Sequence, residues 1–261
     1  MNVSEIISHS LHAGRLAAGF LRENSGQALE VSTKFDNSPV TRIDRESQAL
    51  IVDYLKKEFP DIPVIAEEQD LASNKSVNRS GPYFVVDPLD GTASYIRGIP
   101  FYCTSIALCL RQETVTGVIV DPNHGEEYTA TRGAGAYLNG SKIGTTTRTR
   151  LEDLYLNVNH TKFPQERFDR INKNVLRKIK RFHKLGSLCL EVAYVAAGRL
   201  DGTINNDLSM WDIAAAGLIV EEAGGSWSTL NGSQPVFPFF EKIDICASNS
   251  REVHEMILAA L

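Results

Sequence analysis

Residues 87–92 (DPLDGT) combine the residue types that phosphoryl chemistry needs. They follow an apolar run, residues 83–86, which is typical of a buried strand, so two carboxylates stand at a strand end. Pro88 stiffens the link between them, and Gly91 permits a backbone turn that a side chain would obstruct. Carboxylates suit a hard cation, backbone N–H groups suit an anion, and Thr92 supplies a hydroxyl near both. The segment therefore predicts a site for a metal ion and a phosphate group.

Acids also stand at the ends of other predicted elements. Taken singly, Asp44 or Asp212 is typical of a helix cap, and Glu67 of a solvated turn. Asp87 and Asp90 differ, because two acids after a buried strand repel each other unless a cation neutralises them. Oxygen ligands favour Mg²⁺, Mn²⁺ or Ca²⁺. If two ions clamp the reacting oxygens of a phosphate, Asp87 is the best candidate for the acid that bridges them.

Water is the simplest nucleophile that the sequence offers. No G-x-S-x-G segment is present. A metal ion lowers the pKa of a water bound to it, which favours direct attack of that water on phosphorus. Glu67 and Thr92 could orient and deprotonate the water. Asp44 could accept a hydrogen bond from the Thr92 hydroxyl and so fix its rotamer.

The four cysteines are predicted to be reduced core residues. Cys103, Cys109, Cys189 and Cys246 all lie in apolar runs, and no C-x-x-C pair is present, which argues against a zinc site. None of them lies in a Gly-rich or basic phosphate loop, so a cysteine nucleophile is not expected. Reduced thiols fit a cytoplasmic location.

Composition narrows the class of protein. The chain has 261 residues, 43% of them hydrophobic, and a net charge of -5, so a sizeable core is expected. A nucleic-acid or membrane partner is not expected, because such surfaces usually show a basic excess. No signal-peptide pattern is recognised, and no apolar run reaches the length of a membrane span.

The elements that must position these acids alternate in two different ways. The first part predicts helices at residues 4–23 and 44–58, joined by a loop at 24–40. An antiparallel meander follows, with strands at 63–66, 82–86, 101–110, 115–120 and 126–131 and a hairpin end at 136–140.

The last third predicts strands at 154–158, 182–184, 199–204 and 242–247, and helices at 168–179, 186–197, 210–223 and 252–261. Two stacked α/β lobes would pack such elements. We predict an N-terminal lobe at residues 1–145, which carries most of the metal ligands. A C-terminal lobe at 146–261 would carry Asp212 and the substrate-specificity segment, which includes residues 186–188 and Asn205.

These motifs, in this order, resemble the inositol monophosphatase family of Mg²⁺-dependent, lithium-sensitive phosphatases. The matching segments are residues 40–44, 66–68, 87–92, 98–108, 133–140, 186–202 and 211–225. The resemblance implies the α/β (α+β) class, as a layered αβαβα sandwich of the inositol monophosphatase and fructose-1,6-bisphosphatase type. It also implies a homodimer and inhibition by lithium.

The resemblance also implies a ligand set for two Mg²⁺ ions, which Mn²⁺ could replace. Glu67, Asp87 and the carbonyl of Leu89 would hold one ion, and Asp87, Asp90 and Asp212 the second. A third, looser ion near Glu67 is compatible with it.

The phosphate group would rest on the N–H groups of Gly91 and Thr92 at a helix start, where the helix dipole favours anions. Lys34 is the nearest match to a lysine that family members carry before the segment ending in Asp44.

The substrate pocket departs from that of the animal enzymes. Asn205 stands where those enzymes place a glutamate, and Leu188 replaces a small residue after Gly186 and Ser187. The predicted substrate-binding residues are Asp90, Gly91, Thr92, Gly186, Ser187, Leu188, Asn205 and Asp212. Inositol 1-phosphate is the leading candidate for the substrate. Fructose 1,6-bisphosphate, histidinol phosphate and nucleoside 3′,5′-bisphosphates are the alternatives, because relatives process them.

Two rival interpretations stay open. A haloacid-dehalogenase-type phosphatase uses a D-x-D-G-T nucleophile motif, but here two residues separate Asp87 from Asp90 and the motif lies far from the start of the chain. A catalytically silent regulatory protein on the same fold is the other rival, although all the acids that match the family are present.

Overall fold

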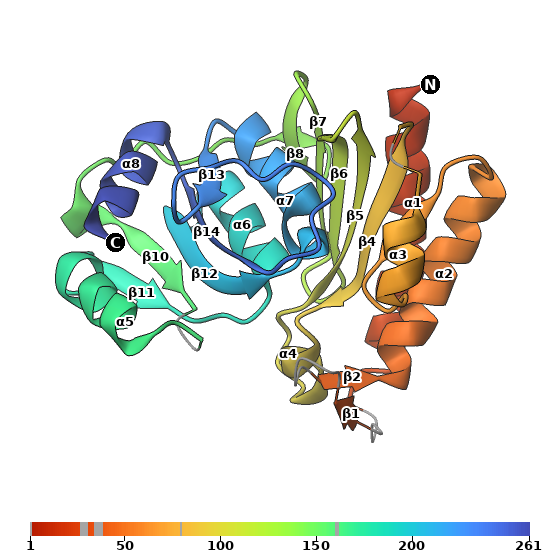
Figure 1. Cartoon of the computed structure of the whole chain (residues 1–261), viewed down its shortest axis with the longest axis horizontal. Helices are drawn as coiled ribbons and strands as arrows, with labels where there is room; N and C mark the ends of the chain where they lie inside the picture. Colours follow the sequence, from red (N-terminus) through yellow and green to blue (C-terminus); the bar gives the residue numbers. More distant parts are fainter. Residues whose placement is uncertain (1, 27–30, 34–38, 79, 160–161) are drawn as a thin grey trace.

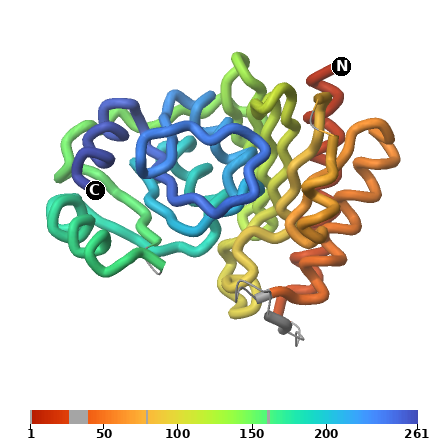
Figure 2. Tube along the Cα trace, in the orientation of Figure 1, coloured from red at the N-terminus to blue at the C-terminus, as the bar shows by residue number. Residues whose placement is uncertain are grey.

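The computed structural model describes residues 2–26, 31–33, 39–78, 80–159 and 162–261. Its elements stack in five layers, in the order helices, sheet, helices, sheet, helices (Figure 1). The predicted αβαβα sandwich is therefore confirmed. The trace in Figure 2 places one sheet with the N-terminal helices on one side of the molecule, and the other sheet with the C-terminal helix on the opposite side.

The first layer consists of α1 (Val3–Glu23) and α2 (Arg42–Glu58), which cover the outer face of the larger sheet. Apolar side chains from both helices, such as Ala13 and Leu55, pack against sheet residues such as Ile106. Both predicted helices are confirmed. The second begins two residues earlier than expected, because a capping box at Thr41 fixes its first turn.

The larger sheet has seven strands in the order β3-β4-β5-β6-β7-β8-β9. The strands are β3 (Val64–Ala66), β4 (Tyr83–Asp90), β5 (Cys103–Leu110), β6 (Glu113–Asp121), β7 (Glu126–Thr131), β8 (Gly135–Leu138) and β9 (Ser141–Lys142). The predicted meander is confirmed from β4 onward, whereas β3 pairs with β4 in parallel. The strand predicted at residues 82–86 is longer than expected and includes both Asp87 and Asp90.

The middle layer consists of α6 (Leu188–Ala196) and α7 (Met210–Glu222), which lie between the two sheets (Figure 1). Most residues of both helices are buried, because sheet residues pack against them from both sides. The main hydrophobic core of the molecule is therefore centred on these helices, and their first turns have fixed positions relative to both sheets.

The smaller sheet has five strands in the order β11-β10-β12-β14-β13. Their bounds are β10 (Tyr155–Val158), β11 (Arg181–His183), β12 (Gly202–Leu208), β13 (Ser226–Thr229) and β14 (Ile243–Ser248). The outer layer contains α5 (Gln165–Ile171), continued by a π-helical turn (Asn172–Leu176), and α8 (Arg251–Ala260). These elements close a separate apolar cluster on the outer face of the smaller sheet.

Several predicted boundaries are wrong. The strand predicted from residue 199 begins at Gly202, because the N–H groups of Arg199 and Leu200 still bond to the Tyr194 carbonyl at the end of α6. No pattern predicted α3 (Leu71–Ser76), the 3₁₀ turn (Leu151–Asp153) or β13. Two short strands, β1 (Val31–Thr33) and β2 (Pro39–Thr41), lie where a loop was expected.

Two further expectations can be compared with the structure. All four cysteines are free and buried, as predicted. In the part of the chain that the structure describes, no helix has the length and apolarity required to cross a bilayer. The strands of the larger sheet end at Lys142 and those of the smaller sheet begin at Tyr155, while the division into lobes at residues 145 and 146 stays a prediction.

Candidate metal centre

A β-bulge near the end of β4 turns Asp87 and Asp90 to the same side. Asp87 pairs with Ser105 of β5 and Asp90 with Cys103, so three residues of β4 are matched to two of β5. In a regular strand, residues three apart point to opposite faces, and one extra residue reverses that relation. Asp87 also accepts a hydrogen bond from the N–H of Leu89 (3.0 Å), which fixes the bulged segment.

Asp212 reaches the two strand acids from the start of α7. Carboxylate oxygens of Asp87, Asp90 and Asp212 all lie within 4.8 Å of one another. Asp212 is held there by a capping box in which it accepts a hydrogen bond from the N–H of Ser209 (2.7 Å). The structure therefore brings together three predicted metal ligands from segments more than a hundred residues apart.

Glu67 lies at the same end of the sheet. It follows β3, and the parallel register of Ala66 with Val86 places it beside Asp87. Its N–H donates to the Val86 carbonyl (3.2 Å). The negative charge of Glu67 raises the pKa of Asp87, Asp90 and Asp212. Glu67 is thus an electrostatic neighbour of the three aspartates.

Burial and mutual repulsion make these acids hard to ionise in the absence of a cation. Burial is the largest cause in each case, and it raises the pKa of Asp87 well above its ordinary value and that of Asp90 less strongly. The pKa of Asp212 rises to about 8, through burial and then the charges of Glu67 and Asp90. Clustered buried oxygens that repel one another suit a hard divalent cation, which would favour their ionised forms.

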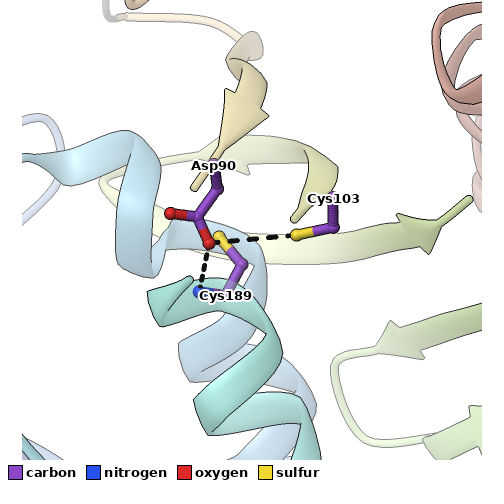
Figure 3. Close-up of side chains that lie close together, drawn as sticks. All are labelled: Asp90, Cys103 and Cys189. Carbon is purple, nitrogen blue, oxygen red and sulfur yellow. Dashed lines mark hydrogen bonds between the residues drawn. The ribbon is translucent and has the colours of Figure 1, made fainter. Parts of the chain in front are cut away.

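Asp90 is held by hydrogen bonds from α6. Its Oδ2 accepts from the Ser187 hydroxyl (2.5 Å) and from the N–H of Cys189 (2.7 Å). The other oxygen points away from Cys103 and Cys189 (Figure 3). Ser187, predicted as a substrate contact, is buried, and its hydroxyl positions this carboxylate.

The turn after Asp90 requires glycine. Gly91 has a φ of 97°, and a Cβ there would lie 2.9 Å from the Phe101 carbonyl oxygen and 3.2 Å from the Cβ of Ser187. The short helix α4 (Thr92–Ile96) starts at the next residue, as the sequence suggested. A phosphate group on the N–H groups of Gly91 and Thr92 stays a prediction.

The predicted hydrogen bond between Thr92 and Asp44 is confirmed. The Thr92 hydroxyl is 2.9 Å from Oδ1 of Asp44 and 3.2 Å from the Leu89 carbonyl. The other oxygen of Asp44 accepts from the backbone N–H of Thr41 (2.7 Å) as part of the cap of α2. One buried carboxylate therefore fixes both the start of α2 and the rotamer of Thr92.

The predicted specificity segment contains a buried acid that the sequence did not reveal. Glu191 accepts hydrogen bonds from the N–H of Gly186 (2.9 Å) and from the amide of Asn205 (2.9 Å). The Asn205 amide also donates to Thr203 (2.6 Å), so both of its hydrogens are used inside the protein. Leu188 is buried in the first turn of α6. Substrate contacts by these residues remain predictions.

Other residues near the site were also missed. Ser47 donates to the Pro88 carbonyl (2.8 Å) from a buried position on α2, and Lys242 lowers the pKa of Asp212. Neither lies in a recognisable motif. Each reaches the site from a segment that is distant in the sequence, so sequence spacing could not reveal the contact. Lys34 lies outside the described residues.

The metal-free protein is expected to lose stability as pH rises. Burial raises the pKa of Glu191 from 4.5 to about 7, and that of Asp212 rises from 3.8 to about 8. Between the ordinary and the raised values, the folded state holds protons that the unfolded state has released, so the free energy of unfolding falls with pH. Mg²⁺ would offset the part due to the aspartates by binding their ionised forms.

Melting temperatures at about pH 5.5 and about pH 8.5, each measured with a chelator and with Mg²⁺, check this expectation. We expect the lower melting temperature at the higher pH with the chelator, and a smaller difference with Mg²⁺. Equal melting temperatures at both pH values with the chelator would contradict it.

Comparisons with known proteins agree with this geometry. The family model described as "Inositol monophosphatase family" matches residues 2–261. Nus factor SuhB of Escherichia coli K12 is 34% identical over 258 residues, covering 97% of this chain and 94% of the relative. Inositol-1-monophosphatase of Mesorhizobium japonicum is 34% identical over 241 residues, covering 88% of each.

Solved structures of similar proteins agree with the family match. The extragenic suppressor protein SuhB of Bartonella henselae is 32% identical, with a TM-score of 0.89 and 98% of each chain covered. The Thermotoga maritima IMPase is 29% identical, with a TM-score of 0.87, covering 98% of this chain and 96% of that one.

Proposed function

This chain belongs to the inositol monophosphatase family, and on that premise we propose that it is a Mg²⁺-dependent phosphomonoesterase that hydrolyses a small polyol or sugar phosphate. The observation that carries the proposal is the convergence of Asp87, Asp90 and Asp212 within 4.8 Å. Glu67 lies beside them at the end of the sheet. A cluster of two buried acids and one half-buried acid is costly for a protein that does not bind a cation.

The donor set fits the predicted ions. Glu67, Asp87 and the Leu89 carbonyl would hold one Mg²⁺, and Asp87, Asp90 and Asp212 a second. Mg²⁺ supplies two things when bound: it lowers the pKa of water and neutralises charge on the phosphoryl oxygens. Mn²⁺, which also prefers oxygen ligands, is proposed to substitute, and a third ion near Glu67 is compatible with this arrangement.

The chain's own groups would orient the attacking water. The Thr92 hydroxyl directs its hydrogen toward Asp44 and the Leu89 carbonyl, so its oxygen lone pairs are left to accept a hydrogen bond from water. Glu67 would accept the proton as the water attacks phosphorus in line. The N–H groups of Gly91 and Thr92 would hold the phosphoryl oxygens, and a water beside Asp90 and Asp212 would protonate the leaving alkoxide.

Removing the Thr92 hydroxyl is expected to slow turnover without unfolding the protein. Thr92→Val keeps the shape of the side chain but cannot accept a hydrogen bond from water, so kcat should fall about a hundredfold. Asp44→Asn should cost about tenfold to a hundredfold, because it loosens the rotamer of Thr92.

The double variant should be no slower than Thr92→Val, because both changes remove one function. Thr92→Ser is the matched control and should retain most of the turnover. Full additivity of the two losses would contradict the proposed coupling.

Inositol 1-phosphate is the substrate that we propose first, and a phosphate-release panel tests it. The panel compares inositol 1-phosphate, fructose 1,6-bisphosphate, histidinol phosphate, adenosine 3′,5′-bisphosphate and NADP, with Mg²⁺ and with a chelator. We expect the highest kcat/KM for inositol 1-phosphate and none without Mg²⁺. A strong preference for the nucleotides would reject the inositol assignment and keep the reaction class. No release from any ester would reject the phosphatase itself.

Further properties belong to the same proposal. Lithium would inhibit by occupying one metal position, and the protein would act as a cytoplasmic homodimer. We propose a small-molecule phosphate ester as the main partner, without nucleic acid or membrane.

The printed names of relatives supply a second candidate. Curated proteins that are 34% identical to this chain are called Nus factor SuhB, which favours a regulatory role through a macromolecular partner. That role does not require turnover. It becomes the better proposal if purified protein binds Mg²⁺ but releases phosphate from no ester of the panel.

A further inference from the structure

Two cysteines lie against the back of the acid cluster. Cys103 is the first residue of β5 and pairs with Asp90, while Cys189 lies in the first turn of α6. Figure 3 shows both side chains next to the same oxygen of Asp90. The Cys103 sulfur is 3.9 Å from Asp90 Oδ2, and the two sulfurs and a carboxylate oxygen of Asp90 all lie within 4.8 Å of one another.

These separations suit a thiophilic cation. Zinc–thiolate and zinc–carboxylate bonds of about 2.3 and 2.0 Å at tetrahedral angles place ligand atoms roughly 3.5–3.8 Å apart. The Cys103 sulfur and Asp90 Oδ2 already lie at 3.9 Å, and no two of the three ligand atoms are more than 4.8 Å apart, so their separations exceed that requirement by about 1 Å at most. A fourth position is left for water or for the Ser187 hydroxyl, whose oxygen is 3.7 Å from the Cys103 sulfur.

We propose that Cys103, Cys189 and Asp90 form a second metal site, selective for thiophilic cations such as Zn²⁺ and Cd²⁺, which shares Asp90 with the Mg²⁺ cluster. Binding replaces one proton on each sulfur: the cation gains two metal–thiolate bonds and two protons leave to solvent. Mg²⁺ does not compete for the sulfurs, because it prefers oxygen ligands.

Occupation of this site would change the Mg²⁺ ligands. Asp90 Oδ2, which now accepts hydrogen bonds from Ser187 and Cys189, would bond to the cation instead. The Cys189 thiol also donates to the Asp212 carbonyl (3.1 Å), and that bond would be lost. Both aspartates would therefore shift, and the added positive charge nearby would weaken Mg²⁺ binding. We infer that thiophilic cations inhibit the enzyme through this pair.

The sequence prediction against a zinc site is incomplete for a clear reason. The C-x-x-C rule detects ligands that are neighbours along the chain. Here the two thiols are 86 residues apart in the sequence and meet because β5 and α6 pack together in the main core. Burial raises the pKa of Cys103 to about 12, so both thiols stay protonated until a cation replaces the protons.

Cadmium binding tests the site without reference to activity. The full chain, kept reduced with a phosphine and in excess Mg²⁺, is titrated with Cd²⁺ while the near-ultraviolet thiolate-to-cadmium band is recorded. We expect a band that saturates at one Cd²⁺ per chain. It should be lost in Cys103→Ala and in Cys189→Ser, and retained in Cys109→Ala, a matched control on the same strand whose thiol faces Thr114.

Thermal unfolding checks that each variant is folded. If one is not, Cys103→Ser or Cys189→Ala replaces it. Absence of the band in the natural chain, or its persistence when both cysteines are replaced, would overturn the proposal.

The inhibition part rests on the proposed phosphatase activity. Zn²⁺ should inhibit Mg²⁺-dependent phosphate release, and the Zn²⁺ concentration for half-inhibition should rise at least about tenfold in Cys103→Ala, whose basal turnover should be unchanged. An unchanged half-inhibition would place the inhibitory Zn²⁺ among the three aspartates and overturn this part. If no phosphate is released at all, the Cd²⁺ titration still decides whether the site exists.

Discussion

Replacing Asp90 by asparagine is expected to abolish Mg²⁺-dependent phosphate release while leaving the fold intact. Asp90 belongs to the cluster with Asp87 and Asp212, and the proposed second ion depends on it. Loss of several kcal/mol of charge stabilisation corresponds to a fall in kcat of about 10³-fold or more. Asparagine also removes one of the charges that repel one another in the buried cluster. The metal-free variant should therefore melt no lower than the natural chain at neutral pH.

Three measurements check this result: phosphate release at saturating Mg²⁺, Mg²⁺ binding by calorimetry, and the melting temperature with a chelator. Asp53→Asn is the matched control, because it makes the same chemical change on the exposed surface of α2. It should alter none of the three. Turnover that survives in Asp90→Asn would remove the metal assignment, and a large fall in the melting temperature would make Asp90 a structural residue.

Replacing Glu67 by glutamine should slow turnover without removing the Mg²⁺ site, unlike the replacement of Asp90. Glu67 lies beside the three aspartates and its charge raises their pKa values, so the neutral variant should ionise them more readily. Mg²⁺ binding by the three aspartates should therefore persist. The proposed proton acceptor is lost, and kcat should fall about 10²- to 10⁴-fold.

Two quantities are measured for the variant and for the natural chain: kcat, and the Mg²⁺ concentration that gives half of the maximal activity. Glu68→Gln is the control, since it removes a carboxylate from the next residue and should preserve turnover. Equal rates for Glu67→Gln and the natural chain would exclude Glu67 as the base. An aspartyl-phosphate trapped on Asp87 would instead support the haloacid-dehalogenase-type mechanism.

Most of the helices and strands could be predicted because hydrophobic periodicity is a local signal, whereas their stacking in five layers was implied by the resemblance to the family. The helix at the N-terminus and the meander from β4 to β8 both follow from patterns within ten to twenty residues. The bond between Thr92 and Asp44 was predicted from the chemistry of one hydroxyl and one acid. Boundaries failed where capping bonds at a helix end decided them, as at Leu200, whose N–H bonds to the Tyr194 carbonyl at the end of α6.

The surroundings of Asp90 could not be predicted, because they depend on which segments pack together. Nothing near Ser187 or Cys189 in the sequence indicates that one carboxylate accepts bonds from both. Glu191 was missed for the same reason, since its partner Asn205 lies on a different element, β12. A sequence reveals which groups are available for chemistry, whereas their hydrogen-bond partners follow from the packing of distant elements.

The bulge in β4 ties the acid cluster to the backbone as well as to the side chains. Without the mismatched pairing of β4 with β5, residues three apart such as Asp87 and Asp90 would project from opposite sides of the sheet. A change that straightened this segment while keeping its length would therefore separate the two carboxylates, although every acid of the chain would still be present.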